Sequence, residues 1–290
     1  MRILISGGSG FLGRALSARL LQDGAEVAWV SRDPGRVAPA GIQVLGYGDL
    51  QPSLCFDAVL NLAGAGIADR RWSDRRRQVL FDSRLGPTRS LLEWIRRGGH
   101  LPRVLVSGSA VGWYGDQGDV SLTETSPPHE DFSHVLCSTW EAAAMEAVPL
   151  GVPVLLLLRT GVVLDPEGGM LRRLLTPFRL GLGGRLGNGQ QWMPWIHIDD
   201  LVRLFAHVLA NDSCAGIYNA CSPQPVRNAE FTRILARTLR RPALLPAPAW
   251  ALKLLLGEMS VLLVGGHHVQ PRRTADSGFE WEQPELSAAL

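Results

Sequence analysis

Three spaced glycines near the start of the chain could form a phosphate-binding turn. The apolar residues 2–6 precede the run Gly7-Gly-Ser-Gly-Phe-Leu-Gly13, and apolar residues at helical spacing follow it. This order predicts a strand, a tight turn and a helix. Glycines let the backbone turn sharply and let a pyrophosphate approach the helix N-terminus, where free N–H groups and the helix dipole favour an anion. The spacing fits both Gly8-x-Gly10-x-x-Gly13 and Gly7-x-x-Gly10-x-x-Gly13, and it predicts a dinucleotide site at Gly7, Gly8, Ser9, Gly10, Phe11, Leu12 and Gly13. The alternative is a glycine-rich turn that binds nothing.

The residues after the second predicted strand indicate which dinucleotide is bound. Residues 27–30 are apolar, and Ser31-Arg32-Asp33 follow them. A carboxylate directly after this strand would bind the ribose hydroxyls of NAD, whereas Ser31 and the guanidinium of Arg32 could bind a 2′-phosphate. The sequence therefore favours NADP(H). NAD(H) stays possible, because Asp33 lies only one position late and because Arg32 could be a solvated surface residue.

Two further strand ends could contribute to the same site. Asp49 follows the third predicted strand, where it could accept a hydrogen bond from the adenine amino group or simply form a turn. Asn61-Leu-Ala-Gly64 follows the fourth strand. The small residues Ala63 and Gly64 would leave room for the cofactor, and Asn61 could bridge backbone groups. The alternative there is a plain turn.

Apolar runs and helical segments alternate along the first half of the chain. The runs 27–30, 42–45, 58–60, 104–106 and 152–158 lie between segments with helical periodicity at about 10–22, 73–97 and 133–147. This alternation predicts an α/β fold with a doubly wound parallel sheet. We expect a dinucleotide-binding domain at residues 1–165, to which about 190–225 returns, and a smaller, mostly helical substrate region at 166–290. The latter includes a C-terminal extension at about 240–290.

Composition limits the classes of function. The 290 residues are 46% hydrophobic and 19% charged, which is typical of a globular enzyme, and the net charge of +2 with no prominent basic block makes nucleic acid a poor partner. The four cysteines show no C-x-x-C spacing, and the first strand begins too early for a signal peptide, so we expect a cytoplasmic protein. Charges and prolines interrupt the apolar stretch 244–266, which therefore predicts packed helices and no membrane span.

The motifs together resemble those of the extended and atypical branch of the short-chain dehydrogenase/reductase superfamily. Within it, the chain is most similar to the epimerase family of nucleotide-sugar-epimerase-like proteins that carry a short C-terminal extension of unknown role. The resemblance covers essentially the full length, and it implies a Rossmann-type fold that binds NADP(H) or NAD(H). The motifs are Ser6–Gly13, Asn61–Gly64, Arg70–Trp72, Asp82–Arg84, Val106–Gly115, Leu136–Glu141, Arg159–Leu164, Trp195–Asp200 and Gly278–Leu290.

The resemblance also implies where the catalytic residues should lie. The superfamily uses a tyrosine as general acid/base, a lysine four residues later that lowers its pKa, and a serine or threonine that binds the substrate oxygen. Ser109 stands where that serine belongs, and its hydroxyl could donate to a carbonyl. The Tyr-x-x-x-Lys pair cannot exist here, because Lys253 is the only lysine and no tyrosine precedes it by four residues. By position in the motif, Cys137 and Glu141 replace the pair.

This replacement changes the expected proton relay. A carboxylate at position 141 would raise the pKa of the Cys137 thiol, yet it could still accept hydrogen bonds from the ribose of the nicotinamide half. The candidates for proton transfer are Tyr114, Glu141, Cys137 and His134, in that order. The structural alternatives are that Tyr114 anchors a loop, Cys137 is a buried apolar residue and Glu141 is a surface helix residue.

One further sequence feature argues against a nucleotide sugar as the substrate. Nucleotide-sugar enzymes of this branch carry an arginine that clamps the diphosphate, and Met193-Pro194 occupy that place here. The tryptophan-rich loop 191–195 instead favours an apolar or aromatic small molecule. His197 and Asp200 lack a third ligand at suitable spacing, so we expect no metal site.

The sequence thus predicts an NADP(H)-dependent oxidoreductase or epimerase-like enzyme that acts on a small carbonyl or hydroxyl compound with an altered proton relay. The alternative is a catalytically weak NADP(H)-binding sensor or scaffold protein. By analogy with related folds, the helical segments 73–97 and 133–147 could form a homodimer.

Overall fold

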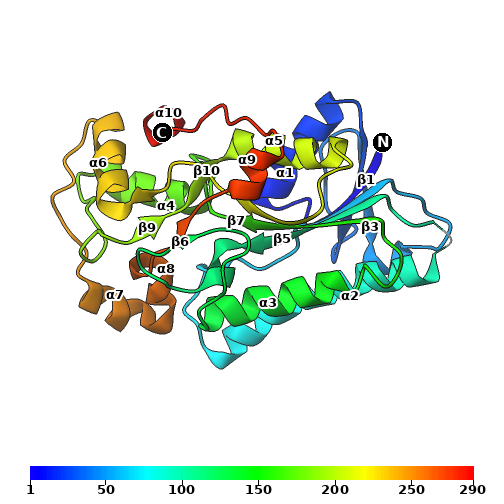
Figure 1. Cartoon of the computed structure of the whole chain (residues 1–290), viewed down its shortest axis with the longest axis horizontal. Helices are drawn as coiled ribbons and strands as arrows, with labels where there is room; N and C mark the ends of the chain where they lie inside the picture. The colour runs from blue at the N-terminus through cyan, green and yellow to red at the C-terminus, as the bar shows by residue number, and fades with distance from the viewer. Residues whose placement is uncertain (99) are drawn as a thin grey trace.

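Seven parallel strands form the centre of the computed structural model, which describes residues 1–98 and 100–290. The order across the sheet is β11-β7-β5-β4-β1-β2-β3, and all neighbours run parallel. The predicted doubly wound α/β fold is therefore confirmed (Figure 1). The strand bounds are β1 (Arg2–Ser6), β2 (Glu26–Ser31), β3 (Ile42–Gly46), β4 (Ala58–Asn61), β5 (Val104–Ala110), β7 (Val154–Thr160) and β11 (Gly216–Ala220).

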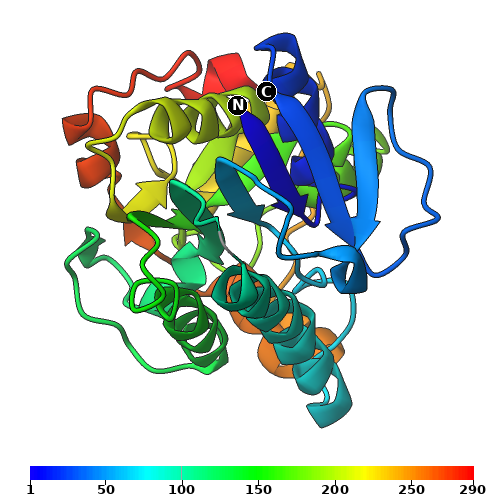
Figure 2. The same ribbon diagram turned by 90° about the vertical axis from the view of Figure 1, so that its right-hand side faces the viewer.

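Helices cover both faces of this sheet, which explains why its strands read as continuous apolar runs. Helices α1 (Phe11–Gln22) and α5 (Ile198–Ala210) lie on one face, and α2 (Asp74–Arg97) and α3 (Phe132–Met145) lie on the other (Figure 2). Alternate residues of β1 show the division. Ile3 packs in the core that contains α1 and α5, whereas Leu4 packs in the core that contains α2.

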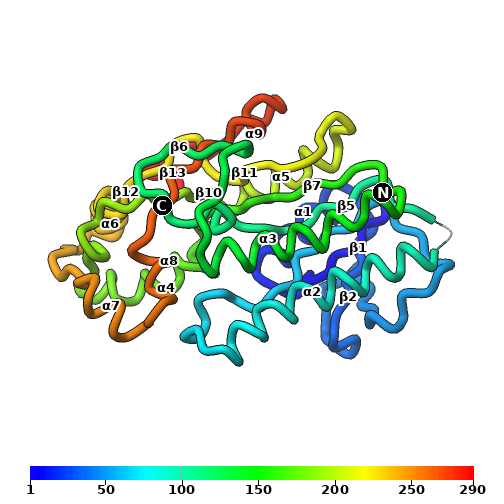
Figure 3. Tube along the Cα trace, turned by 60° about the horizontal axis from the view of Figure 1, so that its bottom comes forward, coloured from blue at the N-terminus to red at the C-terminus, as the bar shows by residue number. Residues whose placement is uncertain are grey.

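The two helices of the second face begin where polar side chains cap them. Ser73 Oγ accepts a hydrogen bond from the backbone N–H of Arg76, and an Asp131 carboxylate oxygen accepts one from that of His134. Such caps satisfy N–H groups that have no partner inside the helix. Helices α2 and α3 then run side by side beneath the sheet (Figure 3).

The smaller C-terminal region lies beyond the carboxyl end of the sheet and is mostly helical, as predicted. Its helices are α4 (Gly169–Arg179), α6 (Asn228–Thr238), α7 (Ala249–Leu256), α8 (Val261–Val264), α9 (Arg272–Asp276) and α10 (Leu286–Ala289). Three short strand pairs accompany them: β8 (Val162–Asp165) with β10 (Trp195–His197), β9 (Trp192–Met193) with β12 (Val226–Arg227), and β6 (Ser121–Leu122) with β13 (His268–Val269). Single helical turns of the 3₁₀ type occur at η1 (Tyr47–Asp49), η2 (Val111–Tyr114) and η3 (Gly257–Ser260).

One carboxylate ties the end of the chain to the sheet domain. Asp200 on α5 is fully buried, and its two oxygens accept hydrogen bonds from the backbone N–H groups of Glu282 and Gln283. Arg203 donates to the same carboxylate. A buried carboxylate is tolerated only with such partners, so Asp200 fixes the last segment against α5.

The apolar stretch 244–266 forms helices as predicted, and Met259 packs in a core cluster with Trp72 and Leu80, but α7 differs from the prediction because it is not packed. None of the residues of α7 is buried, and Trp250 and Leu254 are each 71% exposed. Among the helices of the described residues, none has the length and apolar character needed to cross a membrane.

Candidate functional site

The glycine turn after β1 depends on close contact with the neighbouring strand β4. Gly7 has a φ of +82°, and a Cβ there would lie 2.8 Å from the backbone of Leu62 and Ala63. At Gly13 a Cβ would lie 2.4 Å from the carbonyl oxygen of Gly7. Gly8 instead faces the indole of Trp29. Gly7 and Gly13 therefore have no room for a side chain because of backbone contacts, and Gly8 has none because a Cβ there would lie 2.1 Å from the Trp29 ring.

The turn leaves the N-terminus of α1 free for an anion. Gly10 is the N-cap residue and offers no side-chain hydrogen bond, and the first turn of the helix contains no acidic residue. The N–H groups of that turn and the positive end of the helix dipole are thus uncompensated. Nearby, Arg14 donates to the carbonyl oxygen of Ser9 and Arg36 donates to its hydroxyl, so two cations flank the turn.

A cavity of about 200 Å³ opens at this turn, between the carboxyl ends of β1, β2 and β4. Seven residues predicted to bind the cofactor line it: Gly7, Ser9, Gly10, Ser31, Arg32, Ala63 and Gly64. Sequence reasoning missed Arg36 and Tyr47, which line it as well. Arg36 lies four residues after Arg32, and its basic side chain was the available signal. The hydroxyl of Tyr47 is 2.8 Å from that of Ser6.

The other residues predicted to bind the cofactor lie outside this lining and have structural contacts. Phe11 packs against Gly168 at the start of α4, Leu12 packs against the sheet core, and the contacts of Gly8 and Gly13 are given above. Asp49 Oδ2 accepts a hydrogen bond from the N–H of Gly46 at 2.8 Å, so it forms the turn that was its alternative reading.

Asn61 is oriented by a side chain and not by the backbone groups that it was expected to bridge. Its Nδ2 donates to Thr88 Oγ1 at 2.8 Å. Its Oδ1 is buried and finds no hydrogen-bond partner within the described part of the chain. Nε1 of Trp140 is also buried without a partner among the described residues, and the tip of its ring and the backbone of Asn61 both lie close to Gly108. Unpaired buried polar atoms of this kind are costly, and they indicate a position where a ligand or water supplies the missing hydrogen bonds.

A buried ion pair lies farther along the same edge of the sheet. Ser109 near the end of β5 and Arg159 near the end of β7 are paired in the sheet register, and Glu141 approaches them from α3. Arg159 donates through Nε to Glu141 Oε1 at 2.9 Å and through Nη2 to Oε2 at 2.8 Å. Arg159 is 1% exposed and Glu141 5%. The carboxylate therefore forms a two-pronged, buried salt bridge.

This pair determines what Ser109 can do. The Ser109 hydroxyl donates to Glu141 Oε1 at 2.6 Å. We expected the hydroxyl to donate to a substrate carbonyl, and the structure shows its proton directed at Glu141 instead. The lone pairs of Ser109 Oγ are then the part that a ligand would meet. Glu141 itself is no surface residue, which corrects that alternative.

Arg159 was not selected from the sequence, although it belongs to one of the quoted motifs. The sequence feature that could have identified Arg159 is a single charged residue near the end of an otherwise apolar strand. Burial lowers the pKa of Arg159, but the hydrogen bonds and charge of Glu141 raise it more, so the guanidinium stays charged. Its Cζ atom also lies 3.4 Å from the centre of the Trp113 ring. Stacking and ion pairing together fix its position.

Tyr114 and Cys137 are poorly suited to exchange protons near neutral pH. Tyr114 is fully buried and its hydroxyl donates to Asn219 Oδ1 at 2.7 Å, while burial raises its pKa to about 12. Burial first and the charge of Glu141 second raise the pKa of Cys137 to about 12. Their contacts match the structural alternatives, an anchored loop and a buried apolar residue. His134, the last candidate, holds its Nδ1 2.6 Å from the carbonyl oxygen of Trp113.

Arg84 on α2 is a further candidate that the fold brings to the site. A Cβ on Gly64 would lie 3.1 Å from its Cζ, so the guanidinium reaches the lining of the cavity. It also lies over the ring of Trp140 at 5.2 Å and donates to the carbonyl oxygens of Ala65 and Leu80. Burial lowers the pKa of Arg84. The arginine thus places a positive charge between the cavity and the Glu141 cluster.

The tryptophan-rich loop serves packing, which removes the reason for expecting it to bind a ligand. Trp195 is fully buried and its Nε1 donates to the carbonyl oxygen of Gln224. Trp192 stacks on His268 with ring centres 4.1 Å apart. His197 Nδ1 accepts a hydrogen bond from the N–H of Asp199, which caps α5.

Comparison with known proteins relates the whole chain to one family. The model of the NAD dependent epimerase/dehydratase family matches residues 3–221, and a domain of unknown function, DUF1731, matches residues 247–290. The chain is 40% identical to the epimerase family protein SDR39U1 of Bos taurus, covering 100% of this chain and 98% of the relative. It is 36% identical to the chloroplastic SDR39U1 homologue of Arabidopsis thaliana, covering 100% and 86%. The crystal structure of human SDR39U1 with NADPH superposes with a TM-score of 0.91 at 35% identity, covering 100% of this chain and 97% of that one.

The burial of Cys137 predicts which thiol reacts with a disulfide reagent. A thiol with a pKa of about 12 is ionised to only about one part in ten thousand at pH 8. Because Cys55 is exposed and the other three cysteines are buried, one equivalent of thiol should react rapidly in the native protein. Cys55→Ser should abolish this phase, and all thiols should react in urea. A rapid second equivalent that Cys137→Ala removes would contradict the assignment.

Proposed function

Because the chain belongs to the NAD dependent epimerase/dehydratase family, we propose that it is an NADP(H)-dependent oxidoreductase or epimerase-like enzyme acting on a small carbonyl or hydroxyl compound. The family and the C-terminal extension agree with the resemblance drawn from the motifs. The observation that carries the proposal is the Ser109–Glu141–Arg159 cluster, which lies on the same sheet edge as the glycine turn. In open parallel sheets, ligands bind along this edge where the strand order reverses, here between β1 and β4.

The cavity has the donors that a dinucleotide phosphate would need. The bare N-terminus of α1 would hold the diphosphate, and Ser31, Arg32 and Arg36 would hold a 2′-phosphate. The unpaired Asn61 Oδ1 and Trp140 Nε1 fit a cofactor that extends from this cavity toward Ser109. The NADPH of the human SDR39U1 structure supports NADP(H) over NAD(H). When bound, the nicotinamide supplies or accepts a hydride.

The proton relay that we propose uses Ser109 and Glu141 in place of Tyr and Lys. In the oxidative direction, a substrate hydroxyl gives its proton to Ser109 Oγ as the Ser109 proton moves to Glu141 Oε1, across the 2.6 Å hydrogen bond. In the reductive direction both protons return. Arg159 holds the carboxylate in place, and Arg84 adds positive charge for a developing alkoxide. The indoles of Trp113 and Trp140 beside this cluster suit an apolar or aromatic substrate.

A second candidate, an NADP(H)-binding sensor or scaffold with weak turnover, is favoured by one observation. Glu141 already accepts hydrogen bonds on both oxygens, and Tyr114 and Cys137 have pKa values of about 12. A carboxylate whose two oxygens both accept short hydrogen bonds takes up a further proton slowly. Cofactor binding would then be the main property of the site.

Replacing Arg32 should weaken the binding of NADPH much more than the binding of NADH. Arg32→Ala deletes a charge-assisted contact with the 2′-phosphate worth about 1.5–3 kcal/mol, so the Kd for NADPH should rise by roughly tenfold to a hundredfold. The Kd for NADH should change by less than about threefold, since NADH lacks that phosphate. Titration calorimetry with both nucleotides measures this, with Arg19→Ala as control, because Arg19 on α1 is half-buried and pairs with Asp23. Equal losses for the two nucleotides would refute the assignment.

A turnover assay distinguishes the proposed enzyme from the proposed sensor. We expect nicotinamide absorbance to change with at least one member of a library of small aldehydes, ketones and alcohols. Ser109→Ala should then lower kcat at least about a hundredfold while leaving the Kd for NADPH nearly unchanged, because it breaks the relay. Ser138→Ala on α3 is the matched control. Tight NADPH binding with no turnover across the library would favour the sensor, and full activity of Ser109→Ala would remove Ser109 from the relay.

A further inference from the structure

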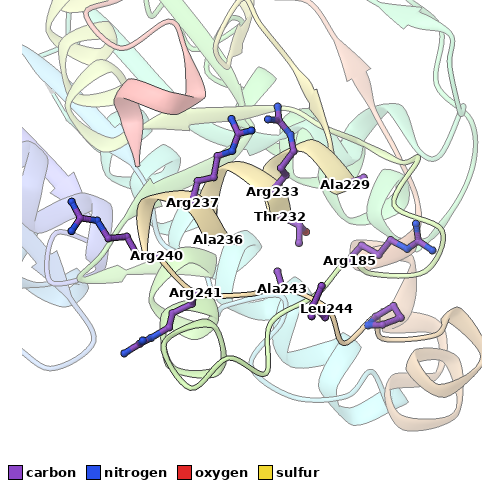
Figure 4. A pocket seen from close by; sticks show the side chains of 11 residues that line it. Arg185, Ala229, Thr232, Arg233, Ala236, Arg237, Arg240, Arg241, Ala243 and Leu244 are labelled. Atoms are coloured by element: carbon purple, nitrogen blue, oxygen red, sulfur yellow. The ribbon is translucent and has the colours of Figure 1, made fainter.

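One end of the C-terminal region carries a group of arginines that the proposed function does not use. Five of them surround a cavity of about 680 Å³, and no carboxylate belongs to its lining (Figure 4). We call this surface the basic end. Its arginines are Arg185, Arg233, Arg237, Arg240 and Arg241.

The charge of this surface contrasts with that of the whole chain. Residues 227–253 contain six basic side chains and one acidic side chain, Glu230, although the net charge of the protein is only +2. Because the arginines are spaced along α6 and the following turn, they form no obvious block in the sequence. Arg233 lies 3.7 Å from Glu230, whereas Arg185, Arg237 and Arg240 have no ion-pair partner in the described part of the chain. Their charges are therefore available to an outside anion.

Arg240 occupies a backbone position where arginine is unfavourable. It follows the end of α6 with a φ of +52°, and it is the one residue other than glycine with a positive φ among those described. Glycine is the usual residue at this position, since a side chain costs free energy there. The side chain of Arg240 projects outward in Figure 4, so its charge faces solvent.

Exposed apolar side chains lie at the same end of the molecule, and one of them, Leu244, lines the same cavity as the arginines. Leu244 is 80% exposed, and Trp250, Leu254 and Leu255 on or near the exposed side of α7 are each 70% exposed or more. Helix α6 and helix α7 lie at the same end of the molecule (Figures 1 and 3). Large apolar side chains gathered in this way generally mark a surface that docks on something.

We propose that the basic end and α7 dock on the surface of an anionic lipid bilayer. Lipid phosphates would contact the arginines, and Trp250, Leu254 and Leu255 would enter the interfacial layer. Basic side chains together with exposed Trp and Leu side chains are typical of segments that bind at the membrane interface. The arginines also diverge, because Arg233 and Arg237 project together while Arg185, Arg240 and Arg241 point in other directions (Figure 4). Tight binding of a single small anion needs convergent donors, so the spread of these side chains favours contact with several phosphates over one.

Co-sedimentation of the full-length protein with vesicles tests this proposal. The protein should bind vesicles of phosphatidylcholine mixed with phosphatidylglycerol and should not bind vesicles of pure phosphatidylcholine. Added salt should release the bound protein. Arg237→Glu/Arg240→Glu should weaken binding at least about tenfold. Trp250→Ser/Leu254→Ser should weaken it even at low salt. Arg75→Glu/Arg89→Glu, which reverses two exposed charges on α2, is the matched control and should leave binding nearly unchanged.

Several outcomes would overturn the proposal. Absence of any preference for phosphatidylglycerol would do so, and so would an equal loss in the α2 control, which would mean attraction by overall charge. Binding of inorganic phosphate by calorimetry without binding of vesicles would assign the arginines to a soluble anion. Size-exclusion chromatography tests whether a second copy of the chain covers α7 instead. A dimer that dissociates in the variant Trp250→Ser/Leu254→Ser would show this.

Discussion

The salt bridge between Glu141 and Arg159 is the interaction on which the arrangement of the site depends. It joins a helix on one face of the sheet to the end of a central strand, and its carboxylate accepts a hydrogen bond from the hydroxyl of Ser109 on the neighbouring strand. Two charges removed from water are stable only when each satisfies the other, and removal of one leaves the other uncompensated. The pair therefore holds α3, β5 and β7 in one geometry. It also explains how a carboxylate can stand where relatives of this fold place a lysine.

A second constraint acts at the other end of the same edge. The turn after β1 passes so close to the chain after β4 that only glycine fits at Gly7, and this contact forms one wall of the cavity. Phe11 extends the contact to Gly168 at the start of α4, while Asp200 binds the last segment of the chain. The C-terminal region is thus attached to the cofactor end of the sheet by packing and to α5 by hydrogen bonds. The proposed site lies between these attachments.

Local patterns were sufficient to predict the first six strands of the sheet, because burial on both faces makes each strand a continuous apolar run. They also predicted the covering helices α1, α2 and α3, whereas α5 was not predicted. The strand β11 was harder to identify, since its sequence Gly-Ile-Tyr-Asn-Ala mixes polar and apolar residues at the edge of the sheet. The glycine turn could also be predicted, because it requires small residues at positions close together in the sequence. The ion pair was not, because Glu141 and Arg159 lie 18 positions apart on different elements and no spacing rule connects them.

Other differences from the sequence prediction have the same physical origin. Tyr114 and Cys137 were ranked as proton carriers by motif position, but their burial raises both pKa values to about 12. The tryptophans of the loop 191–195 were read as ligand contacts, yet Trp195 is in the core and Trp192 stacks on His268. In each case the residue type was compatible with chemistry, and only the tertiary environment decided otherwise. The reverse holds for Arg84, a charged residue that the fold brings to the cavity.

A double-mutant cycle on Glu141→Gln and Arg159→Met, read as the free energy of unfolding in urea, tests the central claim most directly. Each single substitution leaves one buried charge unpaired and should lower the free energy of unfolding by about 3–5 kcal/mol. The double substitution removes both charges, so its cost should fall short of the sum of the two by at least about 2 kcal/mol. Additive costs would show that the two side chains do not interact, and they would contradict this account of the site.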